Sequence, residues 1–379
     1  MSSNAGSLTG YEKMAAAFSP DGTPEFPVVT CYTGLFERDH FSALTELPWW
    51  YLYETDPRKK AQLIAALNAG TDIDWYILSA GSSLDEQRSL QIVPEAGDVC
   101  RVDRRTGSRT MLEPPVISGT LSVLEENMPV IDDLEAYLAR EIPPLIPFTG
   151  IEAGREIQPA LVKQALGTKC ALQHVASPLW AVSSLLGYAQ WFEFMATDPE
   201  PVYQGARRYL AGVIEQVKQS AAVGCQAIWI EECLTDQIGP ARFARYNLPL
   251  IQELTQAIRD AGMWSIYYFC GNPWPVWDML MDSGADALSL EESKKGFDID
   301  IEEVVACTQG RMTIFGNLDT VEMLEKASYQ ELKAEVARQL EAGRRNGRRF
   351  VMSTGSPITP GTTVERVREY VNLVRELGY

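Results

Sequence analysis

The sequence lacks several features that would place it in common classes of protein. It contains no run of about 18 consecutive apolar residues and opens on no apolar run, so it predicts neither a membrane-spanning helix nor a secretion signal. It has no glycine-rich dinucleotide fingerprint and no phosphate loop, which disfavours an open Rossmann sheet. Its seven cysteines show no paired short spacings. We therefore expect free thiols in a reducing compartment, and hence a cytoplasmic protein.

Positive charge is also scarce. The chain has 33 Lys and Arg residues against 51 Asp and Glu, for a formal net charge of −18. This balance argues against binding to nucleic acid or to an anionic membrane surface. A polyanionic substrate would need a local cluster of basic side chains to overcome repulsion by this net negative charge. With 46% hydrophobic and 22% charged residues, the chain can still bury a large core.

Apolar segments of strand length alternate with helical patterns in the second half of the chain. The expected strands there are 170–174, 227–230, 264–269, 285–290, 312–315 and 350–352. Crossover helices between them imply a parallel sheet, and two earlier strands, 27–32 and 73–78, allow closure at eight. We therefore predict a (β/α)8 TIM-type barrel that occupies residues 1–379 as a single domain. The segments 99–103 and 110–112 predict a hairpin, which we expect to be an insertion or a cap over the barrel mouth.

Polar and reactive side chains follow most of these strands, where a parallel barrel places its catalytic mouth. The strand-end residues are His174, Glu231, Glu232, Cys233, Cys270, Asn272, Glu291, Glu292, Asn317 and Ser356. Each type also has a structural interpretation: an acid caps the next helix, Cys270 fills the core, and His174 bonds the backbone. Because these explanations would have to hold at five or six neighbouring strand ends at once, we favour a functional cluster.

Seven segments of the C-terminal half carry a family likeness. They are Asp198-Pro199-Glu200, 224–232, 243–249, Phe269-Cys270-Gly271-Asn272, 284–287, Gly316-Asn317-Leu318-Asp319 and 355–360. In order and spacing they resemble the uroporphyrinogen decarboxylase superfamily over about residues 165–379. The resemblance implies a (β/α)8 barrel with its pocket at the strand ends. It also implies one of two chemistries: decarboxylation of a porphyrinogen, or methyl transfer to or from a corrinoid carried by a partner protein.

The decarboxylase branch is the alternative that this sequence fits less well. Those enzymes carry Arg-Gln-Ala-Gly-Arg-Tyr after the first strand, and its arginines bind the substrate's carboxylates. Here that segment is Cys31-Tyr32-Thr33-Gly34-Leu35-Phe36-Glu37-Arg38, with one arginine. Ser356 stands near the place of a decarboxylase histidine. A polycarboxylate would therefore lose most of its charge-assisted hydrogen bonds.

The methyltransferase branch shows His-x-Cys-Gly-Asn and a later cysteine, which together hold a zinc ion. In this sequence Cys270 is retained, Tyr268 replaces the histidine, and 353–356 contains no cysteine. A zinc ion with about four ligands would then draw on Cys270, on Glu232 or Glu231, on Glu291 and on His174. We take Cys270, Glu232 and Glu291 as the expected metal ligands, and whether zinc is bound stays open.

These features predict a cobalamin-dependent methyltransferase that moves a methyl group from a small, aromatic O-methyl donor to a corrinoid-binding protein. The departing oxygen needs a proton or a metal ion. The expected catalytic residues are Glu231, Glu232, Cys270 and Glu291. The expected substrate contacts are Trp180 and Tyr268, which would hold an aromatic ring, and His174, Asn272, Asn317 and Ser356.

Two further points stay open from the sequence. Side chains alternate along a strand, so one of Glu231 and Glu232 faces the barrel axis and the other faces the surrounding helices or the rim. Dimers are common in the superfamily, and a homodimer is one alternative for this chain.

Overall fold

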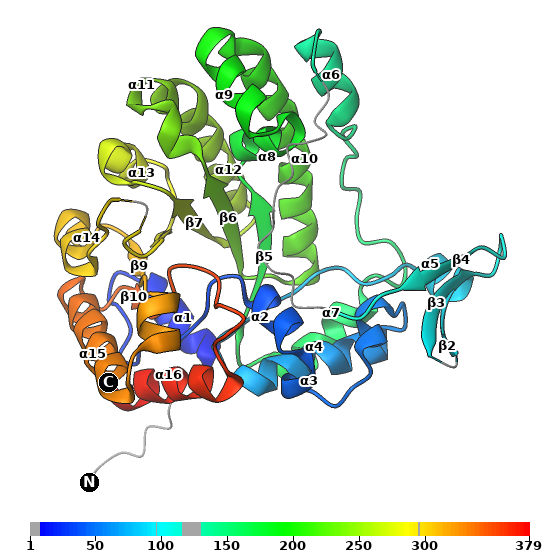
Figure 1. Ribbon diagram of the computed structural model, residues 1–379, viewed down its shortest axis with the longest axis horizontal. Coiled ribbons are helices and arrows are strands. Elements are labelled where there is room, and N and C mark those ends of the chain that lie inside the picture. The colour runs from blue at the N-terminus through cyan, green and yellow to red at the C-terminus, as the bar shows by residue number, and fades with distance from the viewer. Residues whose placement is uncertain (1–7, 96, 116–129, 295) are drawn as a thin grey trace.

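A computed structural model describes residues 8–95, 97–115, 130–294 and 296–379. Its centre is a seven-stranded parallel sheet in the order β1-β5-β6-β7-β8-β9-β10. The strands are β1 (Trp75–Ile77), β5 (Cys170–Ala176), β6 (Ala227–Cys233), β7 (Trp264–Cys270), β8 (Ala287–Leu290), β9 (Thr313–Phe315) and β10 (Phe350–Val351). Helices surround this sheet on its outer side (Figure 1). The predicted α/β barrel is confirmed in strand order and direction.

The predicted first strand is present as a short bridging segment around Val28. Val28 pairs in parallel with Met352, and the amide of Val29 donates to the Met352 carbonyl over 2.9 Å. On its other side, the carbonyl of Val28 accepts from the amide of Asp74 over 2.9 Å, just before β1. The segment therefore joins the two edges of the seven-stranded sheet and closes the barrel.

Large side chains fill the barrel interior. Trp75, Trp229 and Phe315 come from β1, β6 and β9, and none is more than 2% exposed. Their ring centroids lie 5.4 to 6.1 Å apart, the spacing of favourable aromatic pairs. Because side chains alternate along a strand, residues two positions after Trp229 and Trp75 continue toward the mouth, which is the C-terminal end of the barrel.

Helices cover the outside of the barrel. They are α1 (Gly10–Phe18), α2 (Thr33–Asp39), α3 (Phe41–Leu44), α4 (Pro57–Thr71), α5 (Leu84–Ser89), α6 (Leu134–Glu141), α7 (Ile157–Leu166), α8 (Pro178–Leu186), α9 (Tyr188–Thr197), α10 (Pro199–Val223), α11 (Pro240–Arg242), α12 (Leu248–Asp260), α13 (Trp277–Met281), α14 (Ile301–Thr308), α15 (Tyr329–Arg345) and α16 (Val364–Leu377). The longer ones, such as α10, α12, α15 and α16, bury an apolar face. The helix ends follow sequence signals: α10 stops at Gly224, whose φ of 92° suits glycine, and α15 starts at a Ser328–Glu331 capping box. Within the described residues, no helix is long and apolar enough to cross a membrane.

Shorter helical turns complete the chain. The 3-10 turns are η1 (Trp49–Tyr53), η3 (Thr235–Ile238) and η5 (Trp274–Val276), and the π-helical turns are η4 (Phe243–Asn247) and η6 (Thr320–Lys326). The turn η4 leads into α12 directly behind β6, and it supplies a buried asparagine to the site described below.

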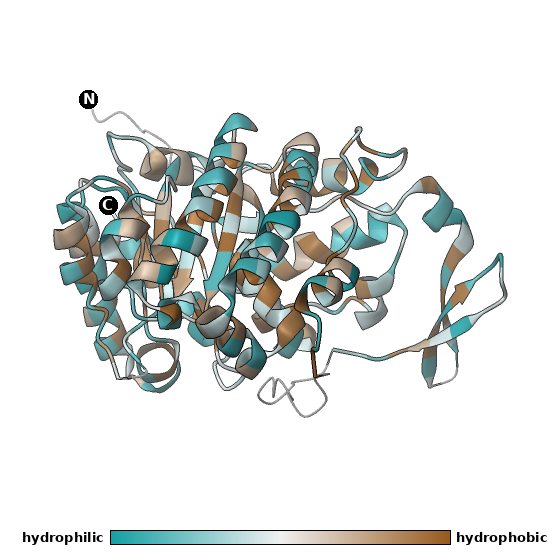
Figure 2. Cartoon of the chain, turned by 90° about the horizontal axis from the view of Figure 1, so that it is seen from above, coloured by the Kyte–Doolittle hydropathy of each residue, from teal (hydrophilic) through white to brown (hydrophobic). Residues whose placement is uncertain are grey.

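The predicted hairpin is confirmed as β3 (Asp98–Asp103) and β4 (Arg109–Leu112), but a third strand, β2 (Leu90–Glu95), extends it to an antiparallel sheet. Its small core of Ile92, Val99 and Leu112 packs on Trp49 and Trp50. The expectation that it covers the mouth is wrong. In both views the sheet projects sideways from the body, and Figure 1 shows it beside α5 and beyond α4 (Figures 1 and 2).

Candidate active site

Glu231 and Tyr32 form a carboxyl–phenol pair at the barrel mouth. Glu231 lies two residues after the interior Trp229 on β6, so its side chain faces the barrel axis. The phenol of Tyr32 donates a hydrogen bond to Oε1 of Glu231. Burial raises the pKa of Glu231, and the bond from Tyr32 opposes that rise. A carboxyl group whose pKa is raised by burial is suited to general acid catalysis.

The backbone of Tyr32 is itself unusual. The residue follows the bridging segment that closes the barrel and precedes α2, and its φ of 49° is left-handed. Non-glycine residues adopt this conformation uncommonly, and it persists where the surrounding structure imposes it. Here it turns the phenol across the mouth from the first strand to β6.

Three further rings, those of His174, Trp229 and Tyr268, lie around this pair, and together with Tyr32 we call them the aromatic cluster. Tyr268 stacks on Trp229 at 5.1 Å and meets Tyr32 edge-on at 5.5 Å. His174 lies 5.9 Å from Trp229 and 6.3 Å from Tyr32. Burial lowers the pKa of His174 to about 4, so its imidazole is neutral at physiological pH. The cluster surrounds one carboxyl group with uncharged rings, of which Tyr32 and His174 are partly exposed.

Glu232 points the opposite way, into the helix layer. Its Oε2 accepts hydrogen bonds from Nδ2 of Asn247 at 2.9 Å and from the phenol of Tyr267 at 3.0 Å. It is fully buried, and burial raises its pKa to about 7. Strand alternation therefore separates the two acids as predicted, and the structure does not bring Glu232 into the mouth.

A lysine holds the acids that follow β8. Nζ of Lys294 lies 2.7 Å from Oε1 of Glu291 and 3.4 Å from Oε1 of Glu292, and it also donates to Oγ of Ser356. Burial raises the pKa of Glu292, and the lysine opposes that rise. Glu291 is thus part of an ion-pair network that ties the loop after β8 to the loop after β10.

Two thiols end neighbouring strands of the mouth. Cys233 and Cys270 are register partners on β6 and β7, so their side chains lie on the same side of the sheet. Both side chains are partly exposed. A third thiol, Cys31, is fully buried beneath Tyr268.

The predicted zinc ligands do not come together. Glu232 faces the helix layer, and Glu291 is paired with Lys294. Across the described ranges, no group of three or more His, Cys, Asp and Glu side chains is arranged to hold a metal ion. A zinc ion needs about four such ligands, so the residues present do not fit the expected site.

The other predicted substrate contacts, Asn272, Asn317 and Trp180, make hydrogen bonds within the protein. Oδ1 of Asn272 accepts a hydrogen bond from the backbone amide of Trp274 at 3.2 Å, and the backbone amide of Asn272 donates one to Asp236 at 3.0 Å. Nδ2 of the buried Asn317 donates to two backbone carbonyls. Trp180 lies in the first turn of α8, where its amide donates to the cap Ser177. Only His174, Tyr268 and Ser356 of the predicted contacts lie among the mouth groups described above.

Replacing Asn317 by alanine should lower the free energy of unfolding by about 2 kcal/mol, because two buried carbonyls lose their donor. These are the carbonyls of Glu291, at 3.1 Å, and Ile299, at 2.7 Å. Urea-induced unfolding measures the change. N272A is the matched control and should cost less, since Asn272 is only partly buried. Equal losses in the two variants would contradict this assignment.

Tyr32 and Lys294 were not assigned to the site from sequence, and Cys233 was named as a strand-end residue but given no role. Tyr32 follows the first strand, in the segment where the decarboxylases carry their arginines, so the strand-end rule applied there would have found it. Cys233 continues the Glu231-Glu232 pair by one residue. Lys294 gives no comparable signal, because it lies in the loop beyond the strand end.

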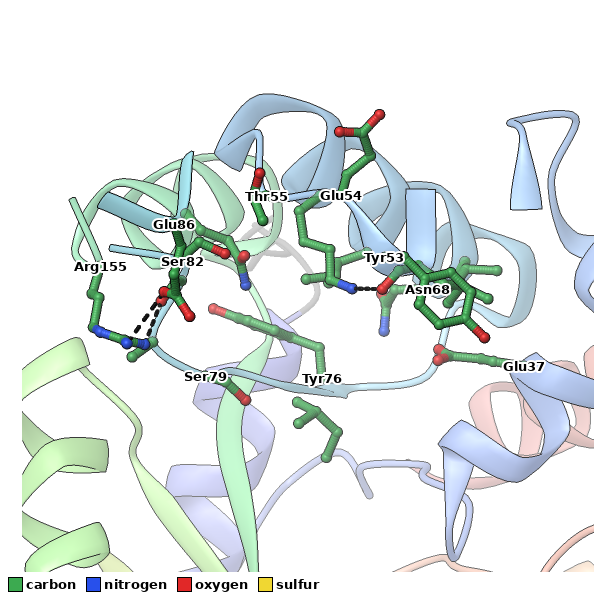
Figure 3. Close-up of a pocket in the computed structure, with 18 of the residues that line it drawn as sticks. Glu37, Tyr53, Glu54, Thr55, Asn68, Tyr76, Ser79, Ser82, Glu86 and Arg155 are labelled. Atoms are coloured by element: carbon green, nitrogen blue, oxygen red, sulfur yellow. Dashed lines mark hydrogen bonds and ion pairs between the residues drawn. The ribbon is translucent and has the colours of Figure 1, made fainter. Parts of the chain in front are cut away.

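A cavity lies beside this site. It has a volume of about 520 Å³ and lies between β1, the loop after it, α4 and α7 (Figure 3). Glu37 lines it, and burial raises the pKa of this carboxyl to about 7. Arg155 closes the opposite side through an ion pair with Glu86 at 3.2 Å. Trp75 belongs both to this cavity and to the barrel core, so the cavity and the aromatic cluster share a wall.

Comparisons with known proteins agree with this geometry. A curated uroporphyrinogen decarboxylase of Thermus thermophilus is 27% identical over 258 residues, which cover 68% of this chain and 67% of the relative. One from Anaeromyxobacter sp. is 23% identical and covers 51% of this chain and 53% of the relative. The chain thus aligns with about half to two thirds of these relatives.

A solved structure described as a methyltransferase from Methanosarcina mazei matches with a TM-score of 0.64 at 16% identity, and it covers 98% of this chain and 99% of its own. It shows the same fold. The family model described as uroporphyrinogen decarboxylase (URO-D) matches residues 157–377, which is more than half of the chain. The chain therefore belongs to the uroporphyrinogen decarboxylase family.

Proposed function

We propose that this protein is a methyltransferase that takes a methyl group from a small aromatic O-methyl donor and passes it to a corrinoid on a separate protein. The observation that carries the proposal is the Tyr32–Glu231 pair within the aromatic cluster. The neutral rings suit a flat, uncharged donor. The carboxyl group of Glu231 can supply the proton that the donor's oxygen must gain.

The residues of the mouth divide the chemistry between them. When the methyl–oxygen bond breaks, the departing oxygen gains negative charge and leaves readily only as it is protonated. Glu231 in its acid form gives that proton, while Tyr32 holds Oε1 and so fixes the orientation of the carboxyl group. Neutral His174 and Tyr268 contact the donor without adding charge.

The corrinoid would supply the nucleophilic metal that accepts the methyl group. Because a partner carries it, the requirement on this chain is an accessible mouth. Tyr32, His174, Glu231, Cys233 and Cys270 are all partly exposed at the C-terminal end of the barrel. A corrinoid presented from that side would face both the Tyr32–Glu231 pair and the aromatic cluster.

The charges of the mouth favour this proposal over porphyrinogen decarboxylation. Glu231, Glu291 and Glu292 contribute three carboxyl groups, and the lysine among them is paired with two. Arg38, the one arginine of the segment after the first strand, pairs with its neighbour Asp39 at 2.7 Å. A substrate with many carboxylates would meet repulsion here.

The test incubates the purified protein with an aryl methyl ether and chemically reduced cob(I)alamin, and follows methylcobalamin by its absorbance and the phenol by chromatography. A parallel reaction supplies uroporphyrinogen without corrinoid. Methylcobalamin and phenol in equal amounts are expected. Carboxylate loss from uroporphyrinogen, with no methyl transfer, would make the protein a decarboxylase.

Replacing Tyr32 by phenylalanine should lower kcat about tenfold, the equivalent of one hydrogen bond to a charged group at about 1.5 kcal/mol. The bond from Tyr32 favours the ionised carboxylate. Its loss should therefore raise the pKa of Glu231 further, and the fall in rate at high pH should move to higher pH. A pH–rate profile of both proteins measures this. A profile that moves to lower pH would contradict the proposed acid.

A further inference from the structure

Cys233 and Cys270 are placed as a closely spaced pair of thiols. They are in register on adjacent parallel strands, which lie about 4.8 Å apart. Disulfides form between residues whose Cα atoms are about 4.4–6.8 Å apart. Residues in register on such strands point to the same side of the sheet, so both side chains face the mouth.

The two thiols are neighbours and can be reached. They are register partners on adjacent strands, and both side chains are partly exposed. Four of the other cysteines, Cys31, Cys100, Cys170 and Cys225, are buried, and Cys307 lies apart on α14. Only the mouth pair combines register pairing on adjacent strands with exposure of both side chains.

We propose that Cys233 and Cys270 are a covalent modification site, a vicinal dithiol that small oxidants close to a disulfide and that trivalent arsenicals bridge. With hydrogen peroxide, two S–H bonds and the O–O bond break, one S–S bond forms, and the peroxide is reduced to two molecules of water. With phenylarsine oxide, the arsenic–oxygen bond is replaced by two arsenic–sulfur bonds and one water leaves. Neither step depends on methyl transfer.

The bridge would change the site's entrance. Glu231 lies two residues before Cys233, and Tyr268 lies two residues before Cys270, on the same side of the two strands. Closing the pair therefore covers part of the way to the carboxyl group and to the aromatic cluster. Oxidation and arsenical binding would both narrow this entrance, because both link the same two thiols.

The experiment treats the intact protein with hydrogen peroxide and counts thiols after denaturation. The count should fall from seven to five, the intact mass should fall by two hydrogen atoms, and dithiothreitol should restore both. Peptide mapping of the wild-type protein should join the Cys233 peptide to the Cys270 peptide. This readout needs no variant and is unaffected by any folding defect.

Three variants sharpen the result. C233S and C270S should form no bridge and bind no phenylarsine oxide, whereas C307S should behave as the wild type in both respects. The proposal fails if mapping joins a different pair, such as Cys31 with Cys270. It also fails if all seven thiols survive peroxide that fully oxidises free glutathione.

Discussion

Replacing Glu231 by glutamine is expected to lower the rate of methyl transfer about 100-fold or more, the usual scale of general acid catalysis. The amide keeps the size of the carboxyl group and its acceptor for the Tyr32 phenol, but it has no acidic proton to give. The rate should be measured with saturating donor and corrinoid, alongside thermal unfolding to show that the fold is intact.

The neighbouring acid supplies the matched control. E232Q changes the same atoms one residue along, but Glu232 faces Asn247 and Tyr267 outside the barrel. Its rate should stay close to that of the wild type. Burial raises the pKa of Glu231, so the wild-type rate should fall as pH rises through that pKa, and E231Q should lose this dependence. Equal rates in E231Q and wild type would remove Glu231 from the mechanism.

The stability of the protein should fall as pH rises from about 5 to 8, and Glu232 should account for about 3 kcal/mol of that fall. Burial raises the pKa of this carboxyl from 4.5 to about 7, and each unit corresponds to about 1.4 kcal/mol. Between those values the folded chain binds more protons than the unfolded chain, so the free energy of unfolding decreases with pH. Denaturant unfolding at a series of pH values measures the slope.

E232Q isolates this contribution. The glutamine carbonyl can still accept hydrogen bonds from Asn247 and Tyr267. In the wild type, Oε1 of Glu232, Oγ1 of Thr235 and Oδ1 of Asn247 are all buried without a hydrogen-bond partner. The glutamine amide, which takes the place of Oε1, adds a donor there. The variant should therefore be more stable than the wild type at pH 8. Glu37 and other buried acids also titrate, so the difference between the two slopes is the decisive quantity. Parallel slopes would show that Glu232 is already ionised without cost.

The regular second half of the chain made its fold predictable from sequence. Strand-length apolar runs, helical periodicity and glycine stops all indicate the same alternation of strands and helices; α10, for example, ends at Gly224. The first half was harder. The strand β2 contains Pro94, which weakens a strand signal. The direction in which the three-stranded sheet projects depends on its packing against Trp49 and Trp50, which no local pattern encodes.

The site was predictable in position but not in pairing. Strand alternation placed Glu231 and Glu232 on opposite sides without saying which faced inward. That choice followed from Trp229, whose ring packs in the barrel core. The expected zinc ligands do not come together, because an acid that is already paired with another side chain is not available as a ligand. Glu291, for example, forms an ion pair with Lys294 in the loop after β8. Tyr32 reaches Glu231 from 199 positions away, a separation at which the sequence alone gives no contact.

The closure of the barrel through Val28 fixes an order of events during synthesis. The first strand segment is made long before one of its partners, Met352, and the amide of Cys31 donates to a hydroxyl 323 positions later, on Thr354. Until then the growing chain holds an open parallel sheet with two unpaired edges. Folding of so non-local a contact is slow. A ribosome that stalls before residue 350 would therefore release a chain prone to pair with its own copies.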